Sequence, residues 1–464
     1  MCAPTTQPNG TPCGTGEYCS EGVCAPCQSG SSCEPSVCHA GTAACGDGGL
    51  TCTDDGPAKD GTSCTGGVCC GGACATCAIP ANATPSCNGT ACAFLCNANY
   101  TACTSGGTST CVDVSNDAAN CGACGNACPS GVACQNGYCA PTTVLTSTLT
   151  DGGGAPLGTV LSLACDSQNV YWVNESGASA VAGVSNPEAV YEVSRDGGAA
   201  IEITSATFSS GGAQSVVVTG STVAYTVNLG GEDTQLYAGT VGAANSASVV
   251  GEMSAGTPVA LTNQGTTFYA ASNNNGSGYV ISDESLTQNQ GTTATSASAG
   301  SPGHTMAIVG TAVFWSDTTN NAISSFATGG TSGAPSTVAS GETGAQNLIT
   351  DGTYLYWVVG PSGSAAIHKT TAHAATQTST TVTTVGAAAW TGAQTLATDG
   401  VHVYWGDVLS GKAGVYSVPV GGGTPTLRAA SLGGAPTNVA ICGTSALAWF
   451  EPNAPGVIRT AKLP

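Results

Sequence analysis

Residues 347–357 read NLITDGTYLYW and residues 395–405 read TLATDGVHVYW, two versions of one unit: an apolar run, a turn and an aromatic cluster. Five more stretches follow this plan: LSLACDSQNVYW (161–172), VVVTGSTVAY (216–225), VALTNQGTTFYA (259–270), MAIVGTAVFW (306–315) and NVAICGTSALAW (438–449). Their last residues recur every 42 to 53 residues. Repeats of about 40 to 50 residues are typical of four-stranded propeller blades. The sequence therefore predicts an all-β fold containing a seven-bladed β-propeller.

The strands of this region indicate how the blades pack and how the ring closes. Residues 216–218, 355–359 and 403–405 are unbroken apolar runs, as expected for strands that are buried on both faces. The last repeat contains no stretch for a fourth, outer strand, whereas residues 142–158 have the form of an outer strand followed by a turn. We expect residues 142–149 to supply the outermost strand of the last blade and to leave no open edge.

Two cysteines in the repeats predict a structural disulfide. Cys165 and Cys442 each lie seven residues before the last Trp of their repeat, in the first and last copies. The other copies carry Val218, Asn263, Ile308, Thr350 and Thr398 at that place. The first and last blades are neighbours in a closed ring, so equivalent strand positions are expected to face each other across the seam. The alternative is a pair of buried free thiols.

The other 24 of the 26 cysteines lie within the first 139 residues. Neither helical nor strand periodicity of useful length is present there, so cross-links must supply the stability that a small core cannot. We expect residues 1–140 to form a disulfide-rich, loop-dominated region of two or three small modules, and residues 141–464 to form the propeller. Such cysteine usage indicates an oxidising compartment outside the cell.

Metal sites in the first region have simpler alternatives. CxxC spacing could indicate zinc, but in a secreted chain it is more often part of a disulfide framework; it occurs at Cys24/Cys27, Cys74/Cys77 and Cys121/Cys124. Adjacent Cys69 and Cys70 are expected to bond to different partners. Residues 53–61 and 113–120 are rich in side chains that carry oxygen atoms, which could bind calcium. Asx turns explain the same composition. We assign no metal and no cofactor.

The charge limits the partners. There are 7 Lys and Arg residues against 27 Asp and Glu, a net charge of −20. Nucleic acid and anionic membranes need clustered cations, so both are disfavoured. No apolar run approaches the ~20 residues of a transmembrane segment. Met1-Cys2 leads directly into turn-rich sequence, so we expect the export signal to be absent from this chain. A lipidated Cys2 is an alternative anchor, although it would leave an odd number of cysteines in the region.

The cysteine pattern of NCGACGNACPSGVACQNGYC (120–139) and of GVCCGGAC (67–74) carries a first resemblance. Over about residues 64–139 the chain resembles plant stigma-specific secreted proteins and exported cysteine-rich proteins of myxobacteria. The resemblance implies an extracellular, bacterial, surface-associated protein. It supplies no catalytic residues.

LITDGTYLYWVV (348–359), LATDGVHVYWGD (396–407) and AIVGTAVFWSD (307–317) resemble the YWTD-type propellers of low-density lipoprotein receptor relatives. Two Asp positions carry the likeness: six residues before the Trp (Asp166, Asp351, Asp399) and two after it (Asp317, Asp407). Propellers of that family have six blades, whereas seven repeats are present here. The resemblance implies a propeller that binds protein or glycan.

No catalytic site is assigned. The motif aspartates could act as acid and base, but Asp at a strand corner usually accepts hydrogen bonds from turn amides. The histidines share no register; they are His39, His304, His368, His373 and His402. No GxSxG, HExxH or P-loop pattern is present. Tyr171-Trp172 and Tyr404-Trp405 could stack on sugars, although packing between blades is the favoured interpretation.

These observations favour a non-enzymatic secreted or cell-surface binding or adhesive protein, with the propeller as interaction scaffold. Its partner would be an extracellular protein or glycan, and self-assembly is compatible with the low charge. One alternative is a propeller enzyme, a lyase or glycan hydrolase, acting at the central funnel. It would need convergent ionisable groups there. Another alternative is a subunit of an extracellular fibre or coat.

Overall fold

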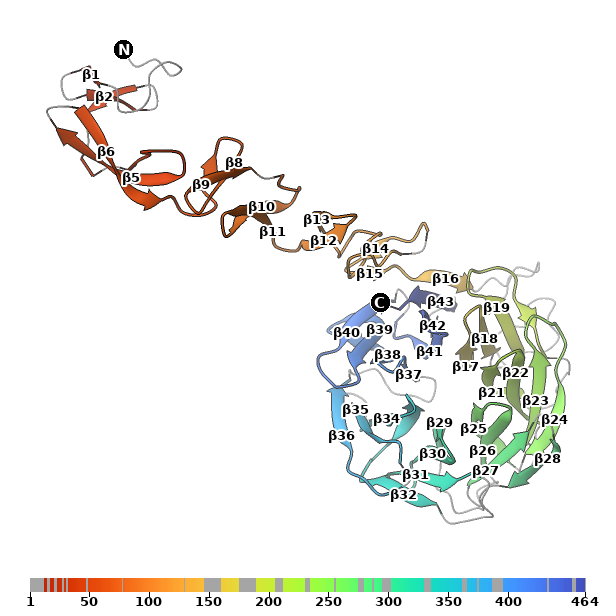
Figure 1. Cartoon of the computed structure of the whole chain (residues 1–464). Coiled ribbons are helices and arrows are strands. Elements are labelled where there is room, and N and C mark those ends of the chain that lie inside the picture. The colour runs from red at the N-terminus through yellow and green to blue at the C-terminus, as the bar shows by residue number, and fades with distance from the viewer. Residues whose placement is uncertain are drawn as a thin grey trace. The chain divides into compact units, whose positions relative to one another are not determined.

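In the computed structural model of the chain, the described residues form strands and turns without a helix (Figure 1). The described residues are 12–14, 17–20, 23–26, 29–30, 32–46, 49–76, 78–128, 130–145, 160–174, 189–204, 212–229, 234–253, 256–273, 279–285, 288–293, 302–328, 335–360, 365–373, 375–385, 395–431, 434–452 and 456–463. In these ranges no helix has the length and apolar character needed to cross a membrane. The all-β expectation is confirmed.

The chain divides into two compact units, one of Met1–Cys128 with Ala133–Gly137, the other of Pro129–Val132 with Tyr138–Pro464. The first unit holds short strands: β1 (Pro12–Gly14), β2 (Glu17–Ser20), β3 (Val23–Pro26), β4 (Ser32–Cys33), β5 (His39–Gly46), β6 (Gly49–Pro57), β7 (Ser63–Cys64), β8 (Gly67–Cys70), β9 (Ala73–Thr76), β10 (Ala83–Asn88), β11 (Ala91–Cys96), β12 (Thr101–Ser105), β13 (Thr108–Val112) and β14 (Cys134–Gln135). β1 to β9 form three three-stranded sheets, and β10–β11 and β12–β13 are hairpins.

The expectation of a loop-dominated region was therefore wrong for the described part of this unit. Its strands are two to nine residues long, and most are too short to show a clear alternation in the sequence. Their hairpins are set by turn chemistry instead. Gly106 and Gly107, between β12 and β13, have φ of 56° and 82°. A two-residue turn of this kind needs positive φ at both positions, which glycine adopts without strain.

Disulfides connect the small sheets in series. The described bonds of this unit are Cys33–Cys52, Cys38–Cys69, Cys64–Cys74, Cys70–Cys87, Cys96–Cys111, Cys103–Cys124 and Cys121–Cys134. Adjacent Cys69 and Cys70 bond to Cys38 and Cys87, which confirms that they have different partners. The two bonds tie β8 to the sheet before it and to the hairpin after it.

The second unit contains seven four-stranded antiparallel sheets among its described residues, which we number sheet 1 to sheet 7 in chain order. The strands of sheets 1 to 4 are β17 (Val160–Cys165), β18 (Asn169–Asn174), β19 (Val190–Ser194) and β20 (Ile201–Glu202); β21 (Gly212–Thr219), β22 (Thr222–Asn228), β23 (Thr234–Thr240) and β24 (Ser248–Met253); β25 (Thr257–Gln264), β26 (Thr267–Asn273), β27 (Tyr279–Ser285) and β28 (Gln288–Thr293); β29 (Pro302–Val309), β30 (Ala312–Asp317), β31 (Ala322–Ala327) and β32 (Ser336–Ser340).

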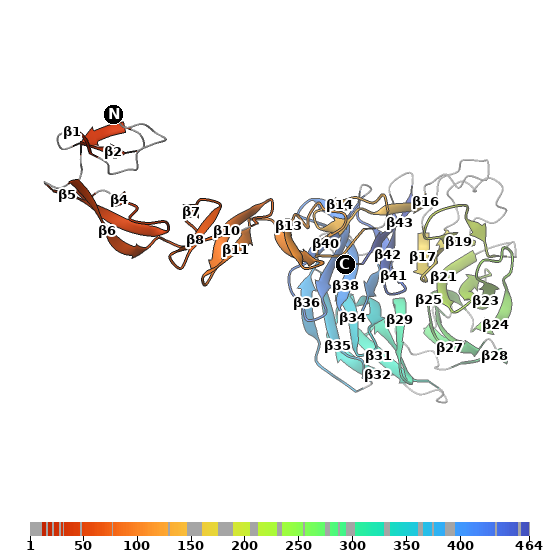
Figure 2. The ribbon, with the colours of Figure 1, turned by 45° about the horizontal axis from the view of Figure 1, so that its top comes forward.

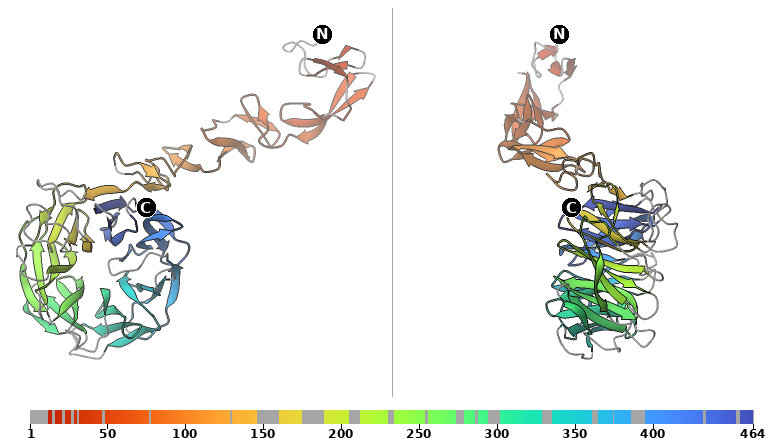
Figure 3. Two further views of the ribbon diagram at one scale, coloured as in Figure 1. Left: turned by 180° about the vertical axis from the view of Figure 1, so that it is seen from behind. Right: turned by 90° about the vertical axis from the view of Figure 1, so that its right-hand side faces the viewer.

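The strands of sheets 5 to 7 are β33 (Gln346–Thr350), β34 (Tyr354–Val359), β35 (Ala366–Thr371) and β36 (Thr380–Thr384); β37 (Leu396–Thr398), β38 (His402–Leu409), β39 (Lys412–Pro419) and β40 (Thr426–Ala430); β41 (Thr437–Cys442), β42 (Ala446–Glu451), β43 (Val457–Lys462) and β16 (Thr142–Leu145). β15 (Tyr138–Cys139) precedes β16. The unit is a β-propeller, which Figure 2 shows tilted and Figure 3 (right) shows from the side.

The first strands of the sheets lie nearest the centre (Figure 1). Each contacts the first strand of the next sheet, from β17 and β21 through to β37 and β41, and β41 also contacts β17. β16 pairs with β43 as the outermost strand of sheet 7, with Thr142 opposite Thr460 and Leu145 opposite Ile458. The described strand ends at Leu145, and residues 146–149 of the predicted strand lie outside the described residues.

The second strand of each sheet explains the unbroken apolar runs. In β18, Trp172 packs in a cluster with residues of sheet 7, such as Phe450. Its neighbour Tyr171 packs on the opposite face with Val216 and Tyr225 of sheet 2. Successive strand residues point to opposite faces, so a strand between two neighbouring sheets needs apolar side chains at every position.

Candidate functional site

The seam between sheets 1 and 7 contains a disulfide. Cys165 ends β17, Cys442 ends β41, and their Cα atoms are 4.9 Å apart. This distance lies within the usual range of about 4.4 to 6.8 Å. The bond closes a loop with a sequence separation of 277. Cys442 is fully buried in the core of the seam.

The two cysteines do not occupy equivalent strand positions, which corrects the sequence alignment. Cys165 pairs with Val170, two residues before Trp172. In sheet 7, the residue two positions before Trp449 is Leu447, and Leu447 pairs with Ile441. Cys442 lies one residue further along, because the turn between β41 and β42 contains an extra residue. Counting back from the Trp passes over this extra residue and makes the two positions look identical.

The one-residue offset decides whether the side chains can meet. Equivalent residues of two neighbouring blades point in the same sense around the ring, so a side chain at one cannot face its equivalent. Moving one residue along a strand reverses the side-chain direction. The offset of Cys442 relative to Cys165 therefore turns their sulfur atoms toward each other.

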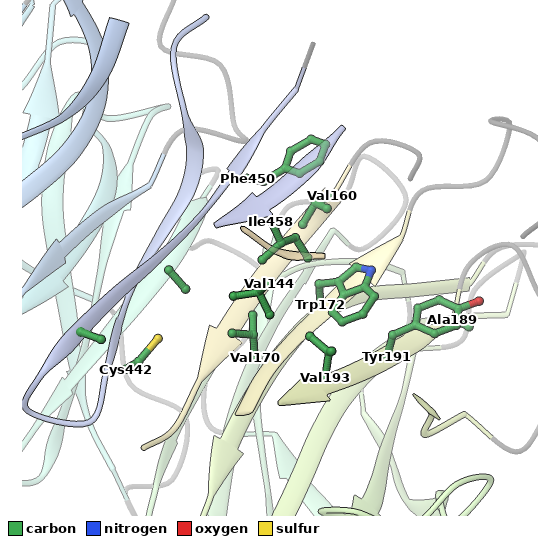
Figure 4. Close-up of a cluster of buried hydrophobic side chains, with 12 residues drawn as sticks. Val144, Val160, Val170, Trp172, Ala189, Tyr191, Val193, Cys442, Phe450 and Ile458 are labelled. Atoms are coloured by element: carbon green, nitrogen blue, oxygen red, sulfur yellow. The ribbon is translucent and has the colours of Figure 1, made fainter. Parts of the chain in front are cut away.

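Apolar side chains fill much of the rest of the seam (Figure 4). Val144 of β16 packs with Val160, Val170 and Ile458 in one buried cluster. Hydrogen bonds and an ion pair add to this packing: Asn438 Nδ2 donates to Val160 O at 2.8 Å, Arg459 Nη1 donates to Thr143 Oγ1 at 2.7 Å, and Arg459 Nε lies 2.9 Å from Glu451 Oε2. The seam thus joins β41 to β17 at the inner edge of the sheets and β16 to β19 at the outer edge.

The Asp residues six positions before the Trp hold the turn that follows the first strand. In sheet 6, Asp399 Oδ1 accepts hydrogen bonds from Val401 N at 2.8 Å and from His402 N at 2.6 Å. Asp399 Oδ2 accepts from the Tyr404 hydroxyl at 2.8 Å. Sheets 1 and 5 repeat this arrangement with the pairs Asp166–Tyr171 and Asp351–Tyr356, each at 2.7 Å. These aspartates therefore have the structural role that their place at a strand corner indicates.

The electrostatics of this Asp–Tyr clamp match its role. Burial, and then the hydrogen bond to Asp399, raise the pKa of Tyr404, so its hydroxyl remains a donor. Burial alone would raise the pKa of Asp399, but the hydrogen bonds from His402 N, Tyr404 and Val401 N outweigh burial and lower that pKa. The carboxylate is thus held ionised in a satisfied turn. Sheet 7 has Cys442 and Ala448 where the clamp has its Asp and Tyr, so the disulfide takes the place of the clamp there.

A second set of carboxylates contacts the buried Trp indoles. Trp405 Nε1 donates to Asp407 Oδ2 at 3.1 Å, and Trp449 Nε1 donates to Glu451 Oε1 at 3.2 Å. Glu451 was missed in the sequence, although it occupies the same place two residues after a Trp. Asp317, at this place in sheet 4, accepts instead from Asn320 N at 2.9 Å.

Glu342 was also missed, and no local pattern points to it. It follows β32 of sheet 4, but its carboxylate accepts from Trp357 Nε1 at 3.0 Å and Ser379 Oγ at 2.5 Å, both in the sheet 5 region. His368 Nδ1 lies 2.8 Å from the same carboxylate. Burial would raise the pKa of Glu342, but the hydrogen bonds from His368, Ser379 and Trp357 outweigh burial and lower it.

The centre of the propeller holds a cavity of about 590 Å³. All seven sheets contribute to its described lining, for example through Leu161, Val216, Val259, Thr305, Ile349, Leu396 and Ile441. The described lining side chains are aliphatic or carry neutral hydroxyl and amide groups. None of the clamp aspartates is among these lining residues.

The other candidate residues are dispersed. His368 and His402 lie in sheets 5 and 6 beside different carboxylates, Glu342 and Asp399. In the first unit, His39 contacts Asp54. His373 is exposed, and the side chain of His304 lies outside the described residues. The described histidines are therefore not brought together. Tyr171, Trp172, Tyr404 and Trp405 are all 0% exposed, which confirms packing between blades rather than a sugar-stacking platform.

The oxygen-rich and CxxC segments of the first unit are engaged internally. Asp54 Oδ1 accepts from Gly56 N at 2.9 Å, Asp113 Oδ1 from Ser115 N at 3.0 Å, and Asp117 Oδ1 from Ala119 N at 2.7 Å, which are turn interactions. Asp60 Oδ1 accepts from Gly71 N at 2.8 Å. Cys121 and Cys124 each bond to another cysteine, as does Cys74. The sulfur atoms of Cys38, Cys64 and Cys74 lie close together, but each belongs to a disulfide. Cys27 and Cys77 lie outside the described residues.

Comparisons with known proteins give structural neighbours only. No protein-family model and no curated protein matches the sequence. A nidogen/laminin complex is similar at 16% identity and a TM-score of 0.38, covering 50% of this chain and 85% of that chain. YCF48 bound to a D1 peptide is similar at 12% identity and a TM-score of 0.45, covering 67% and 94%. TolB from Acinetobacter baumannii has 12% identity and a TM-score of 0.38, covering 64% of each chain. The assignment of the fold rests on the sheets themselves.

Proposed function

We propose that the chain is a non-enzymatic, secreted or cell-surface binding protein whose propeller is the interaction scaffold. Residues 1–140 form its cysteine-rich region, and residues 141–464 form a closed seven-bladed ring. Contacts between successive first strands, including β17 with β41, support the closed ring. The pairing of β16 with β43 and the Cys165–Cys442 bond support a role of both in holding the ring shut.

One observation carries the binding role: the clamp aspartates of the repeats are engaged in building the blades. They are occupied by turn amides and tyrosine hydroxyls, and the described cavity lining is neutral. General acid–base chemistry needs titratable groups that converge on one place. A rigid scaffold with partners bound at its surface turns is the function that such a distribution supports best.

The partner is proposed to be an extracellular protein rather than a glycan. Sugar recognition commonly uses exposed aromatic faces, whereas the aromatic pairs of the repeats are buried. In the described part of the propeller, the exposed large hydrophobic residues are Val249, Val401 and Val408, all aliphatic. The net charge of −20 favours a partner surface that carries cations.

The test is binding of the fluorescently labelled full chain to cells of the source organism. Saturable binding is expected, and removal of surface proteins with protease should abolish it. Periodate oxidation of surface glycans should leave it unchanged. Loss with periodate alone would assign a glycan partner, and the absence of saturable binding would contradict the proposal.

A further inference from the structure

The central cavity has the size and the lining of a small-molecule site. Its volume of about 590 Å³ falls within the range of about 300 to 1,000 Å³ that is usual for ligand pockets. Such pockets are mostly apolar with a few placed polar groups. Leu163, Leu261 and Ile349 supply apolar surface from three different sheets.

The polar side chains of the lining are largely used by the protein itself. Thr350 Oγ1 donates to Tyr354 O at 2.8 Å, and Thr398 Oγ1 donates to His402 O at 2.8 Å. Thr395 Oγ1 donates to Val439 O at 3.0 Å, and Asn438 Nδ2 is bonded to Val160 O. Hydroxyls that are already bonded to the backbone leave the cavity surface more apolar than its composition indicates.

A few polar side chains of the described lining face the cavity. Gln214 and Ser215 of sheet 2 line it, and both are partly exposed. A ligand hydroxyl or carbonyl group can form a hydrogen bond with the Gln214 amide or the Ser215 hydroxyl. The other walls of the cavity offer apolar contact.

We propose that this channel binds an uncharged, mainly apolar small molecule that carries a hydroxyl or carbonyl group. This site is distinct from the surface proposed for the protein partner and does not depend on it. A ligand anion would lose its hydration in a channel whose described lining supplies no cation to pair with it. The site is built on strands of all seven sheets, so its shape is set before the ligand arrives.

The test uses the full chain and the neutral fluorophore N-phenyl-1-naphthylamine, with 1-decanol and decanoate as competitors at pH 7.5. Saturable binding is expected, and decanol should displace the fluorophore at a concentration at least tenfold lower than decanoate. The two competitors share a chain length and differ in charge. Equal displacement by both, or fluorescence that does not saturate, would overturn the proposal.

Variants locate the site. Ala440 is partly exposed in the channel wall, so Ala440→Phe should weaken fluorophore binding at least tenfold without changing the unfolding temperature. Ser215→Phe narrows the same cavity from sheet 2, and fluorophore binding to this variant is the deciding measurement if Ala440→Phe does not fold. Val401→Phe, at a residue that is 60% exposed and outside the lining, should bind like the parent. Parent-like binding by both channel variants, or an equal loss in Val401→Phe, would place the fluorophore elsewhere and refute the proposal.

Discussion

Cys165 and Cys442 are bonded across the propeller seam because they are one residue out of register, not because they are equivalent. The strand pairing makes Ile441 the equivalent of Cys165. An extra residue in the β41–β42 turn then gives Cys442 the opposite side-chain direction. The seam disulfide thus depends on the length of one turn.

Moving the cysteine by one residue should abolish the bond. In the variant Ile441→Cys with Cys442→Thr, the sulfur atom would point away from Cys165, since Ile441 packs against a cluster that includes Ala397 and Tyr404 of sheet 6. We expect two free thiols per chain by titration under denaturing conditions, against none from this pair in the parent. A bond detected by mass spectrometry between residues 165 and 441 would contradict the register assignment.

Removing the bond should lower stability. Closing a loop of this length restricts the unfolded chain by an amount worth about 5 kcal/mol as an upper figure. The paired variant Cys165→Ser with Cys442→Ser should therefore unfold at a lower temperature by calorimetry. Its far-ultraviolet circular dichroism at 25 °C should match that of the parent, because β16 still closes the outer edge of sheet 7.

The Asp–Tyr clamp of sheet 6 should show energetic coupling. Asp399→Asn and Tyr404→Phe each remove part of one interaction, so a double-mutant cycle in guanidinium chloride should give a coupling of about 1 to 2 kcal/mol. Tyr416→Phe is the control, because the Tyr416 hydroxyl donates to Lys412 O at 2.6 Å and not to Asp399. Additive losses from Asp399→Asn and Tyr404→Phe would show that the clamp does not act as a unit.

Two tryptophans offer a matched comparison of buried hydrogen bonding. Trp405 Nε1 donates to the fully buried Asp407, whereas Trp172 Nε1 has no partner among the described residues. Both substitutions to Phe lose similar volume, but only Trp405→Phe removes a donor from a buried carboxylate. We expect Trp405→Phe to reduce the free energy of unfolding by about 1 to 2 kcal/mol more than Trp172→Phe. Equal losses in denaturant titrations would argue against the bond.

Glu342 should make the stability of the folded chain depend on pH. Its pKa in the folded chain is held below the ordinary value of 4.5, so it stabilises the folded state above pH 4.5 and loses this effect as the pH falls through the folded pKa. Glu342→Gln should be less stable by about 2 kcal/mol near neutral pH. The gap between variant and parent should narrow under acid conditions when unfolding temperatures are compared across pH. A constant gap would show that its charge has no role.

Strand β16 should protect an edge that otherwise associates. Val144 is buried in the seam, so Val144→Asp places an unpaired charge there and should release β16 from β43. The exposed edge of β43 should then cause concentration-dependent association, measurable by analytical ultracentrifugation. Thr142→Asp adds the same charge at an exposed position of β16 and should remain like the parent. Association of both variants to the same degree would implicate charge rather than the edge.

Much of the architecture follows from patterns within single repeats. The apolar runs at residues 355–359 and 403–405 indicated strands buried on both faces, and the structure has them as β34 and β38. The Asp before each turn indicated a structural carboxylate, and Asp351 and Asp399 have that role. These features were predictable because each depends on residues only a few positions apart in the chain.

By itself, the sequence determined an all-β propeller, a cysteine-rich region and turns held by aspartate. Only the tertiary structure decided that Cys442 is offset from Cys165, that Glu342 reaches Trp357 and His368 in the next sheet, and that the described lining of the central cavity is neutral. The physical reason is that these relationships join residues on different blades. The packing of one sheet on the next decides which side chains meet, and the sequence of a single repeat does not contain that information.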